Sequence, residues 1–276
     1  MARPLRPLTI MAAALVASST ARSADLQSPR PPTPATLSND PWSGPWLGVY
    51  GGWGFGSPSG SFNIVGGDFV NDLPPAITAP VQSSGSGSIS ASGGLVGVQG
   101  GWNLRLTSDA IVGIEADVGY GGLRGGRSSS GVIAGYNAPY SVSQHYATDW
   151  QAALRARAGY LVTPSTLLFV EAGPAVSRMR YGGSFNDFVP IVNYGEYEAA
   201  SATEWKLGLT LGGGVEYMVT SNLSLRAEYL YTRFPSVKMM GTSNPLFPNP
   251  VPATVAHSSG ALNQNSFRFG VNYYMR

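Results

Sequence analysis

The chain has 276 residues, of which 12% are charged and 11% aromatic, with 36 glycines, 21 prolines and no cysteine. An ordinary soluble domain is about one quarter charged, so this composition argues against a soluble enzyme. The aromatic content argues against disorder, because that much aromatic surface can be buried. The absence of cysteine excludes disulfides and thiolate chemistry, and the two histidines, His145 and His257, are too few for a typical metal centre. We therefore predict no cofactor.

Residues 1–23 are predicted to be a secretory signal peptide. Arg3 and Arg6 precede an apolar run over residues 8–17, and small residues follow up to Ser23. The alternative, a membrane helix, needs about 20 apolar residues, roughly twice this run. Cleavage removes three of the 17 basic residues and leaves 14 against 15 acidic ones, so the net charge near −1 gives no field for nucleic acid.

Residues 24–45 are predicted to form a periplasmic linker. The stretch up to Ser43 holds five prolines among polar residues without any periodicity, which is typical of an extended spacer. A proline-rich ligand for another domain is the alternative. The remaining residues, 46–276, are predicted to form one barrel domain.

From Trp46 onward, apolar residues recur at every second position, which predicts strands. In the first run Leu47, Val49 and Trp53 share one face, and glycines occupy much of the other. The eight predicted strands cover residues 46–56, 95–104, 110–120, 149–162, 168–177, 204–219, 222–232 and 266–276.

Long and short connections alternate between these strands. The short ones, at 105–109, 163–166 and 220–222, are rich in Thr, Ser, Asn, Asp or Pro. This alternation is typical of an up-and-down antiparallel barrel in an outer membrane, with short periplasmic turns and long outer loops. The predicted extracellular loops are about 57–88, 121–146, 182–202 and 233–263.

The charged residues in the central parts of the strands all lie on the glycine-rich face. Ten charges inside a soluble core would be very costly, whereas the opposite face is almost wholly aliphatic and aromatic, so we predict that lipid surrounds the barrel. Glu115 and Asp117 could suggest acid/base catalysis, but the interior cations make ion pairing the more economical role. The predicted network in the barrel lumen is Glu115, Asp117, Arg155, Arg157, Glu171, Lys206, Glu216, Arg226, Glu228 and Arg268.

Aromatic residues on the apolar face lie near the strand ends, as in the aromatic girdles at the two membrane interfaces. The core of a soluble sandwich is the alternative, but it does not explain why these residues avoid the strand centres. The predicted girdle residues are Phe55, Trp102, Tyr120, Trp150, Tyr160, Trp205, Tyr217, Tyr231, Phe267 and Tyr273.

Several segments together resemble a known family. They are ADLQSPRPP, WSGPWLGVYGGWGFG, GGLVGVQGGWNL, IVGIEADVGYGG, LRARAGYL, GGGVEYMVTSNLSLRAEYLYT and FRFGVNYYMR. Over residues 24–275 the chain is similar to the small outer-membrane β-barrel proteins of Gram-negative bacteria, the outer-membrane immunogenic or opacity-like porin family. The resemblance implies an eight-stranded barrel like that of outer-membrane protein A, located in the cell outer membrane and inserted by the barrel assembly machinery, which reads the C-terminal strand. Some members of the family are attributed porin activity or haem binding.

Two features depart from the family pattern. Barrels of this kind usually end on an aromatic residue, whereas Met275 and Arg276 end this chain. Recognition by the assembly machinery is then expected to use Tyr273 and Phe269. Pro174 stands inside the fifth strand, where it removes a ladder donor and is expected to force a bulge.

No catalytic motif is present in the sequence. Neither lysine, Lys206 or Lys238, follows a glycine-rich turn, and there is no nucleophile elbow. We predict a non-enzymatic structural or surface protein that supports envelope integrity or surface interactions, with its interior filled by ion pairs, because an eight-stranded barrel is only wide enough for its side chains. The alternatives are a channel for small solutes or a haem receptor using His145, His257 or loop tyrosines. The surface partner is not specified by the sequence.

Overall fold

The computed structural model describes residues 40–66, 74–188, 190, 195–242, 244–245 and 254–275. The predicted signal peptide and residues 24–39 of the predicted linker lie outside the described residues. Residues from Asp40 onward form one compact unit. Among the described residues, no helix is both long and apolar enough to cross a membrane.

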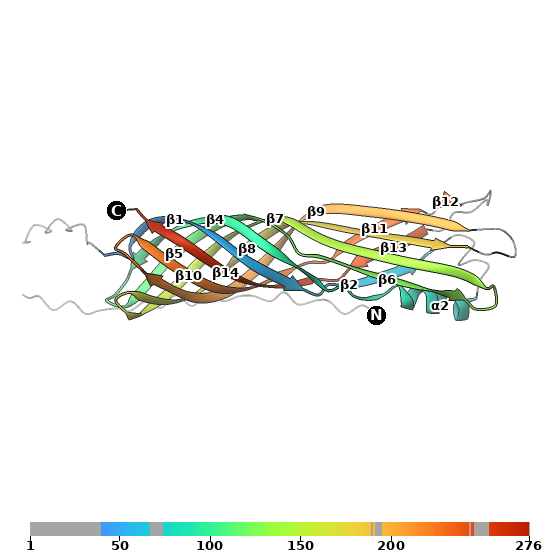
Figure 1. Ribbon diagram of the computed structural model, residues 1–276, viewed down its shortest axis with the longest axis horizontal. Helices are drawn as coiled ribbons and strands as arrows, with labels where there is room; N and C mark the ends of the chain where they lie inside the picture. Colours follow the sequence, from blue (N-terminus) through green and yellow to red (C-terminus); the bar gives the residue numbers. More distant parts are fainter. Residues whose placement is uncertain are drawn as a thin grey trace, which may run out of the picture. The chain divides into compact units, whose positions relative to one another are not determined.

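Eight strands close a ring in the order β1-β14-β10-β9-β8-β7-β5-β4, with β4 pairing back to β1 (Figure 1). All the ladders between neighbours are antiparallel, which confirms the predicted all-β up-and-down barrel. The strands of the ring are β1 (Gly44–Gly56), β4 (Ala91–Arg105), β5 (Ala110–Tyr120), β7 (Ala138–Thr163), β8 (Thr166–Asp187), β9 (Glu196–Met218), β10 (Leu223–Phe234) and β14 (Leu262–Tyr274).

One end of the ring, here called the turn side, carries three tight hairpins. The amide of Leu106 donates to Ala110 O at 2.8 Å, and the amide of Val219 donates to Leu223 O at 2.8 Å. Both chain ends of the ring lie there, because Met275 N donates to Pro45 O at 2.9 Å. The opposite end is the loop side.

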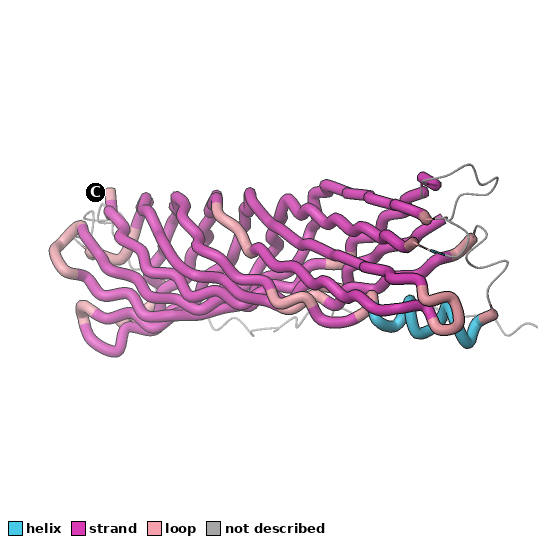
Figure 2. Tube along the Cα trace, turned by 45° about the vertical axis from the view of Figure 1, so that its right-hand side comes forward, coloured by secondary structure: helices cyan, strands magenta, loops and turns pink. Residues whose placement is uncertain are grey.

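The segments predicted to be long loops contain several strands and a helix in the structure. The sheet continues on the loop side as a second region, here called the extension, and the helix lies along one side of its far part in Figure 2. The extension contains the loop-side parts of β7, β8 and β9 together with β2 (Ser59–Ile64), α2 (Pro75–Ser84), β3 (Gly87–Ser88), β6 (Arg124–Ile133), β11 (Val237–Thr242), β12 (Asn244–Pro245) and β13 (Thr254–Ser259).

Two walls build the extension. One wall continues the ring with β6 paired to β7, then β8 and β9, and the other is a separate sheet in the order β11-β13-β2-β3. Helix α2 joins β6 to the second wall, since Arg127 Nη2 on β6 donates to Ser84 O at 3.0 Å and Gln82 Nε2 of the helix donates to Ile64 O on β2 at 3.5 Å.

At a β-bulge in β7, the positions that face the interior change from even-numbered to odd-numbered residues. Between Thr148 and Gln151 the register with β8 shifts by one residue. On the loop side of this bulge Val142, Gln144 and Tyr146 are buried, whereas on the turn side the buried residues are odd-numbered, among them Arg155. One extra residue in a strand reverses the side to which all following side chains point. The bulge therefore separates a region with apolar residues outside from one with apolar residues inside.

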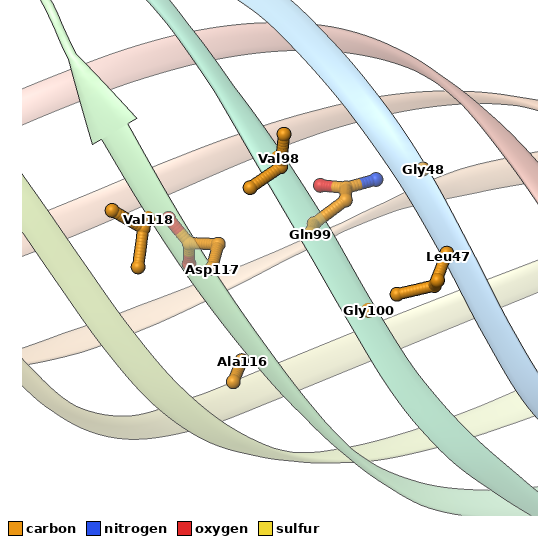
Figure 3. Close-up of a pocket in the computed structure, with 8 residues that line it drawn as sticks. All are labelled: Leu47, Gly48, Val98, Gln99, Gly100, Ala116, Asp117 and Val118. Carbon is orange, nitrogen blue, oxygen red and sulfur yellow. The ribbon is translucent and has the colours of Figure 1, made fainter.

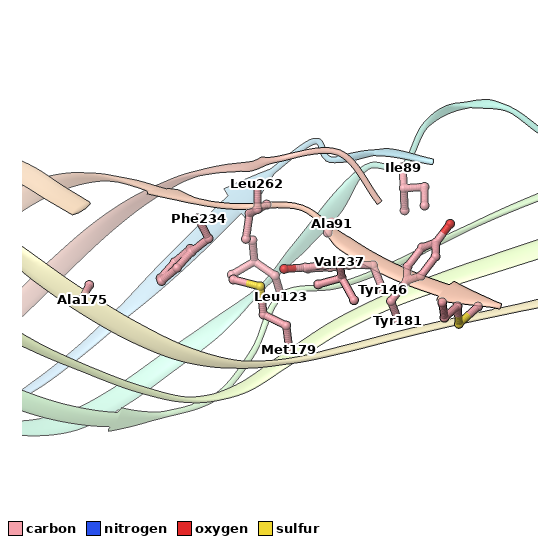
Figure 4. Close-up of a cluster of buried hydrophobic side chains, with 11 residues drawn as sticks. Ile89, Ala91, Leu123, Tyr146, Ala175, Met179, Tyr181, Phe234, Val237 and Leu262 are labelled. Carbon is pink, nitrogen blue, oxygen red and sulfur yellow. The ribbon is translucent and has the colours of Figure 1, made fainter. Parts of the chain in front are cut away.

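Three apolar clusters fill the interior above and below the charged residues. The turn-side cluster is Trp42, Trp46, Ile111, Leu161, Leu167, Met218 and Tyr274. The middle cluster, drawn in Figure 4, is Ile89, Ala91, Leu123, Tyr146, Ala175, Met179, Tyr181, Phe234, Val237, Met239 and Leu262. The distal cluster is Phe62, Ile64, Val81, Ile133, Ala138, Val142, Phe185 and Val255.

Pro174 does not produce the expected bulge. It lies opposite Leu209 in an unshifted ladder with β9, and the register with β7 is the same before and after it. Its ring is exposed on the outer face of β8. Pro174 lacks an amide donor, but the ladder with β9 continues through it. The proline therefore removes a hydrogen bond without inserting an extra residue into the strand, so no bulge forms.

Candidate functional site

Nine of the ten predicted lumen residues meet in the interior of the ring. Their side chains come from six strands, and all nine residues are buried. Alternation along each strand places them there, because residues two apart in a strand face the same side. The nine are Glu115, Asp117, Arg155, Arg157, Glu171, Glu216, Arg226, Glu228 and Arg268.

Glu115 is the centre of this network. Arg155 Nη2 lies 2.7 Å from Glu115 Oε1, and Arg226 Nη1 lies 2.8 Å from Glu115 Oε2. Arg226 also contacts Glu171 Oε2 at 2.7 Å and pairs with Glu228. A carboxylate bound by two guanidinium groups has its lone pairs satisfied without water, which is the condition for burying charge at acceptable cost.

The network has two further branches. On the turn side Arg157 pairs with Glu216, whose Oε1 accepts bonds from Ser224 at 2.5 Å, Asn272 at 2.9 Å and Tyr274 at 3.0 Å. On the other side Asp117 contacts Arg155 at 2.7 Å and Arg268 at 3.2 Å and accepts a bond from Tyr50 Oη at 3.0 Å.

Aromatic rings complete the packing around the guanidinium groups. Arg157 and Arg226 lie 4.0 Å and 4.4 Å from the centroid of the Phe169 ring, and Arg268 lies 4.5 Å from that of Tyr50. Such contacts are favourable when the cation is desolvated. Phe169 and Tyr50 are not among the predicted lumen residues, although both lie buried on the inward face.

Neutral polar side chains border the charges. Gln151 and Gln264 exchange hydrogen bonds of 3.0 and 3.1 Å, and Thr232 donates to Thr210 at 3.0 Å. The cavity beside Asp117, Gln151 and Arg268 measures about 10 Å³. A cavity of that size holds about one water molecule.

Three carboxylates in the network have the spacing of a metal site. One ligand atom from each of Glu115, Glu171 and Glu228 lies within 4.8 Å of the others. Arg226 contacts all three carboxylates, so its guanidinium group supplies the positive charge between them. The donor set therefore fits an ion-pair network better than a metal ion.

Lys206 does not join the network, contrary to the sequence prediction. Its ammonium pairs with Glu204, and the two side chains are 22% and 40% exposed. The ladder between β9 and β10 ends at Leu209, so β10 does not cover β9 at the level of Lys206. The side chain of Lys206 therefore reaches solvent.

The predicted linker includes Trp42, but in the structure this residue packs into the barrel. The residue is 0% exposed, and its Nε1 donates to Pro164 O at 3.0 Å in the turn between β7 and β8. Nearby, Asp40 forms an ion pair of 2.9 Å with Arg105. The aromatic side chain of Trp42 could have indicated a buried position, but the proline-rich, polar composition around it is typical of a linker.

The outer face of the ring is apolar. All ten predicted girdle residues lie on it, with exposures from 37% at Tyr231 to 59% at Trp205. Tyr120 and Trp150 stack edge to face at 5.1 Å, and Phe55 and Phe267 stack at 6.3 Å. Gly48 and Gly100 leave a groove of about 480 Å³ beside the outward side chains of Leu47, Val98 and Val118, drawn in Figure 3. This surface is chemically matched to hydrocarbon chains.

The two histidines have different surroundings. His145 is exposed on β7. His257 is buried in the extension, where Nε2 lies 2.8 Å from Glu198 Oε2 and the ring packs 5.3 Å from that of Phe62. Because its ring is enclosed, His257 is not available as a surface ligand for haem.

The chain matches the family model described as the outer membrane protein beta-barrel domain over residues 10–274. It belongs to this family. The protein is therefore an outer-membrane β-barrel, in agreement with the closed ring and the apolar outer face.

The chain is also similar to proteins named as outer-membrane immunogenic proteins. The chain is 26% identical to the 31 kDa outer-membrane immunogenic protein of Brucella melitensis biotype 1, covering 96% of this chain and 97% of the relative. It is 27% identical to the 25 kDa outer-membrane immunogenic protein of Brucella abortus biovar 1, covering 84% and 86%. The crystal structure of the outer membrane protein OprG from Pseudomonas aeruginosa is 12% identical, with a TM-score of 0.44 and coverage of 86% and 99%.

Proposed function

We propose that the protein is a non-enzymatic structural protein of the outer membrane, whose barrel anchors the extension at the cell surface and conducts no solutes. The observation that carries this proposal is the filled interior. A network of buried ion pairs crosses the ring, with side-chain exposures of 7% or less. Water and solutes would have to displace these contacts, and removing a partner from a buried pair is strongly unfavourable.

The apolar clusters support the same proposal. The turn-side cluster lies on one side of the charges and the middle cluster on the other, so a hydrated path would cross two apolar layers. Apolar constrictions of this kind exclude water from narrow channels. The relatives are named as immunogenic outer-membrane proteins, and this supports a surface role for the extension.

The outward-facing side chains of the ring indicate two kinds of partner, lipid and the barrel assembly machinery. The apolar outer face is expected to contact outer-membrane lipid, and β14 is expected to be recognised by the barrel assembly machinery. Its outward residues Phe269 and Tyr273 are 68% and 56% exposed, so they supply the aromatic surface that the Met275 ending lacks.

Reconstitution into planar bilayers tests the closed interior. The wild-type protein should give no steady single-channel current above the detection limit, while a general porin measured in parallel gives its usual steps. Insertion is checked by heat-modifiable gel mobility of protein recovered from the same bilayer lipid. A large and steady wild-type conductance would replace this proposal by the channel alternative.

A further inference from the structure

Basic residues gather on the outer face of the extension, directly beyond the Tyr120–Trp150 pair. Arg124 on β6, His145 on β7, and Arg178 and Arg180 on β8 all point outward. They come together because β6, β7 and β8 are neighbours at this level, where Arg124 lies opposite Ala147 and Ala147 opposite Arg180.

Arg124, His145 and Arg180 line a hollow in the surface, and Arg178 reaches it through Asp149, a lining residue that lies 3.7 Å from its guanidinium group. The hollow measures about 510 Å³, and its lining includes Tyr120, Arg124, His145, Asp149, Arg180 and Tyr181. The β7 bulge shapes it, since Asp149 lies in the shifted stretch between Thr148 and Gln151. A concave site with converging donors differs from scattered surface arginines, which make no common pocket.

The hollow carries an excess of positive charge. Asp149 is its carboxylate, and it is shared by two guanidinium groups, Arg180 at 2.6 Å and Arg178 at 3.7 Å. The side chains of Arg178 and Arg180 stay 37% and 53% exposed, so both retain donors for another acceptor. Arg124 is exposed, and no carboxylate of the described residues pairs with it.

An apolar surface begins where the basic hollow ends. Trp150, Leu154 and Trp205 are 44%, 56% and 59% exposed on the outer wall. Trp205 lies opposite Arg178 in the ladder between β8 and β9, so the change from apolar to basic occurs within one residue pair. A ligand that matches this boundary has an anionic head and hydrocarbon chains.

We propose that this hollow binds the phosphate-bearing headgroup of a membrane lipid, with Arg124, Arg178 and Arg180 donating to phosphate oxygens and the acyl chains lying along the wall below. Guanidinium groups suit phosphate because they donate two parallel hydrogen bonds. Placing that lipid in the outer leaflet rests on the proposed function, which puts the extension outside the cell.

Binding to the purified barrel in maltoside micelles tests the site. Lipid A, which carries phosphate groups on a hydrocarbon anchor, is the probe, and binding is read by native mass spectrometry and by the shift in unfolding temperature. We expect retained lipid A with the wild type, and roughly tenfold weaker binding for the double variant Arg124→Gln/Arg180→Gln, as for lost charged hydrogen bonds. Inorganic phosphate at equal concentration should not compete, because the wall contributes to the binding of the anchored lipid.

Arg233→Gln is the matched control. Arg233 is also an outward, exposed arginine beyond a girdle residue, Tyr231, but it lies on β10 outside the hollow. This variant should bind lipid A like the wild type, and heat-modifiable mobility should show that all variants are folded. Unchanged affinity in the double variant, or equal binding of lipid A without its phosphates, would overturn the proposal.

A wrong orientation of the barrel can be distinguished from a wrong lipid site. If the double variant loses lipid A but residues near His145 prove inaccessible from outside intact cells, the lipid site stands and the orientation of the barrel is wrong. Phosphate that competes fully with lipid A at equal concentration would instead assign the hollow to a free anion and overturn the lipid proposal.

Discussion

At the scale of single residues, Glu115 is expected to contribute strongly to the stability of the buried ion-pair network. It contacts two guanidinium groups through both oxygens, and its side chain is 0% exposed. Glu115→Gln keeps the shape but leaves Arg155 and Arg226 short of one negative charge in a closed interior. We expect a loss of about 3 kcal/mol in the free energy of unfolding, measured by urea titration of the barrel in vesicles.

Glu204→Gln is the appropriate comparison for Glu115→Gln. Glu204 also pairs with a cation, Lys206, but its side chain is 40% exposed. Exposed pairs contribute about 0–1 kcal/mol, so this variant should unfold almost like the wild type. Equal losses in the two variants would mean that burial does not set the strength of the network.

Trp42 is the second residue whose truncation should be costly. Its ring is fully buried and packs edge to face on Tyr274 at 6.0 Å. Trp42→Ala should lower the free energy of unfolding by about 3–5 kcal/mol, as for other large core truncations. Trp42→Phe, which keeps a ring but loses the bond to Pro164 O, should cost only about 1 kcal/mol. If Trp42→Ala unfolds like the wild type in thermal melts, the residues before β1 do not form part of the fold.

At the scale of elements, the two walls of the extension meet without a continuous ladder. Strand β9 pairs with β10 up to Leu209, and among the described residues its loop-side edge then pairs only with the short β12. The Glu198–His257 pair crosses this seam from β9 to β13 and is fully buried. A buried polar contact between two sheets fixes their relative position.

Glu198→Ala should therefore loosen the seam while leaving the ring intact. We expect faster hydrogen exchange at the amides of β11 and β13, with the amides of β5 and β10 unchanged and the heat-modifiable mobility retained. Lys238→Ala, on the outward face of β11, is the control and should exchange like the wild type. Protection of β11 and β13 in Glu198→Ala equal to that of the wild type would show that the apolar clusters alone hold the walls together.

The ring could be predicted from sequence because each of its strands alternates strongly between apolar and small or charged residues. The extension could not, because its outward residues are small or polar, as in the Arg124–Ser130 stretch, and resemble loop composition. The reversal of faces at the β7 bulge adds to this difficulty, since Asp149 and Trp150 interrupt the alternation that a continuous strand would show. Lys206 was misplaced for a related reason: its face was predicted correctly, but the end of the neighbouring ladder at Leu209 depends on tertiary structure.

At the scale of the whole molecule, the ring and the extension have opposite surfaces. The ring is apolar outside and charged inside, whereas the middle apolar cluster fills the interior where the ring meets the extension, and the distal cluster fills the interior of the extension. A polar outer wall is unsuited to hydrocarbon, so the membrane is expected to end near the β7 bulge. The extension then stands in water as a small enclosed body continuous with the barrel.

The direction of insertion follows from the strand count and the position of the chain ends. Both ends of the ring lie on the turn side, and barrels of this class place their short turns in the periplasm. A protease site inserted after Gly135, in the exposed turn between β6 and β7, should be cut when protease is added to intact cells. The same site inserted after Ser221, in the turn between β9 and β10, should be cut only after the cells are opened. Cleavage at Ser221 and protection at Gly135 in intact cells would place the extension in the periplasm and remove the basis for a surface role.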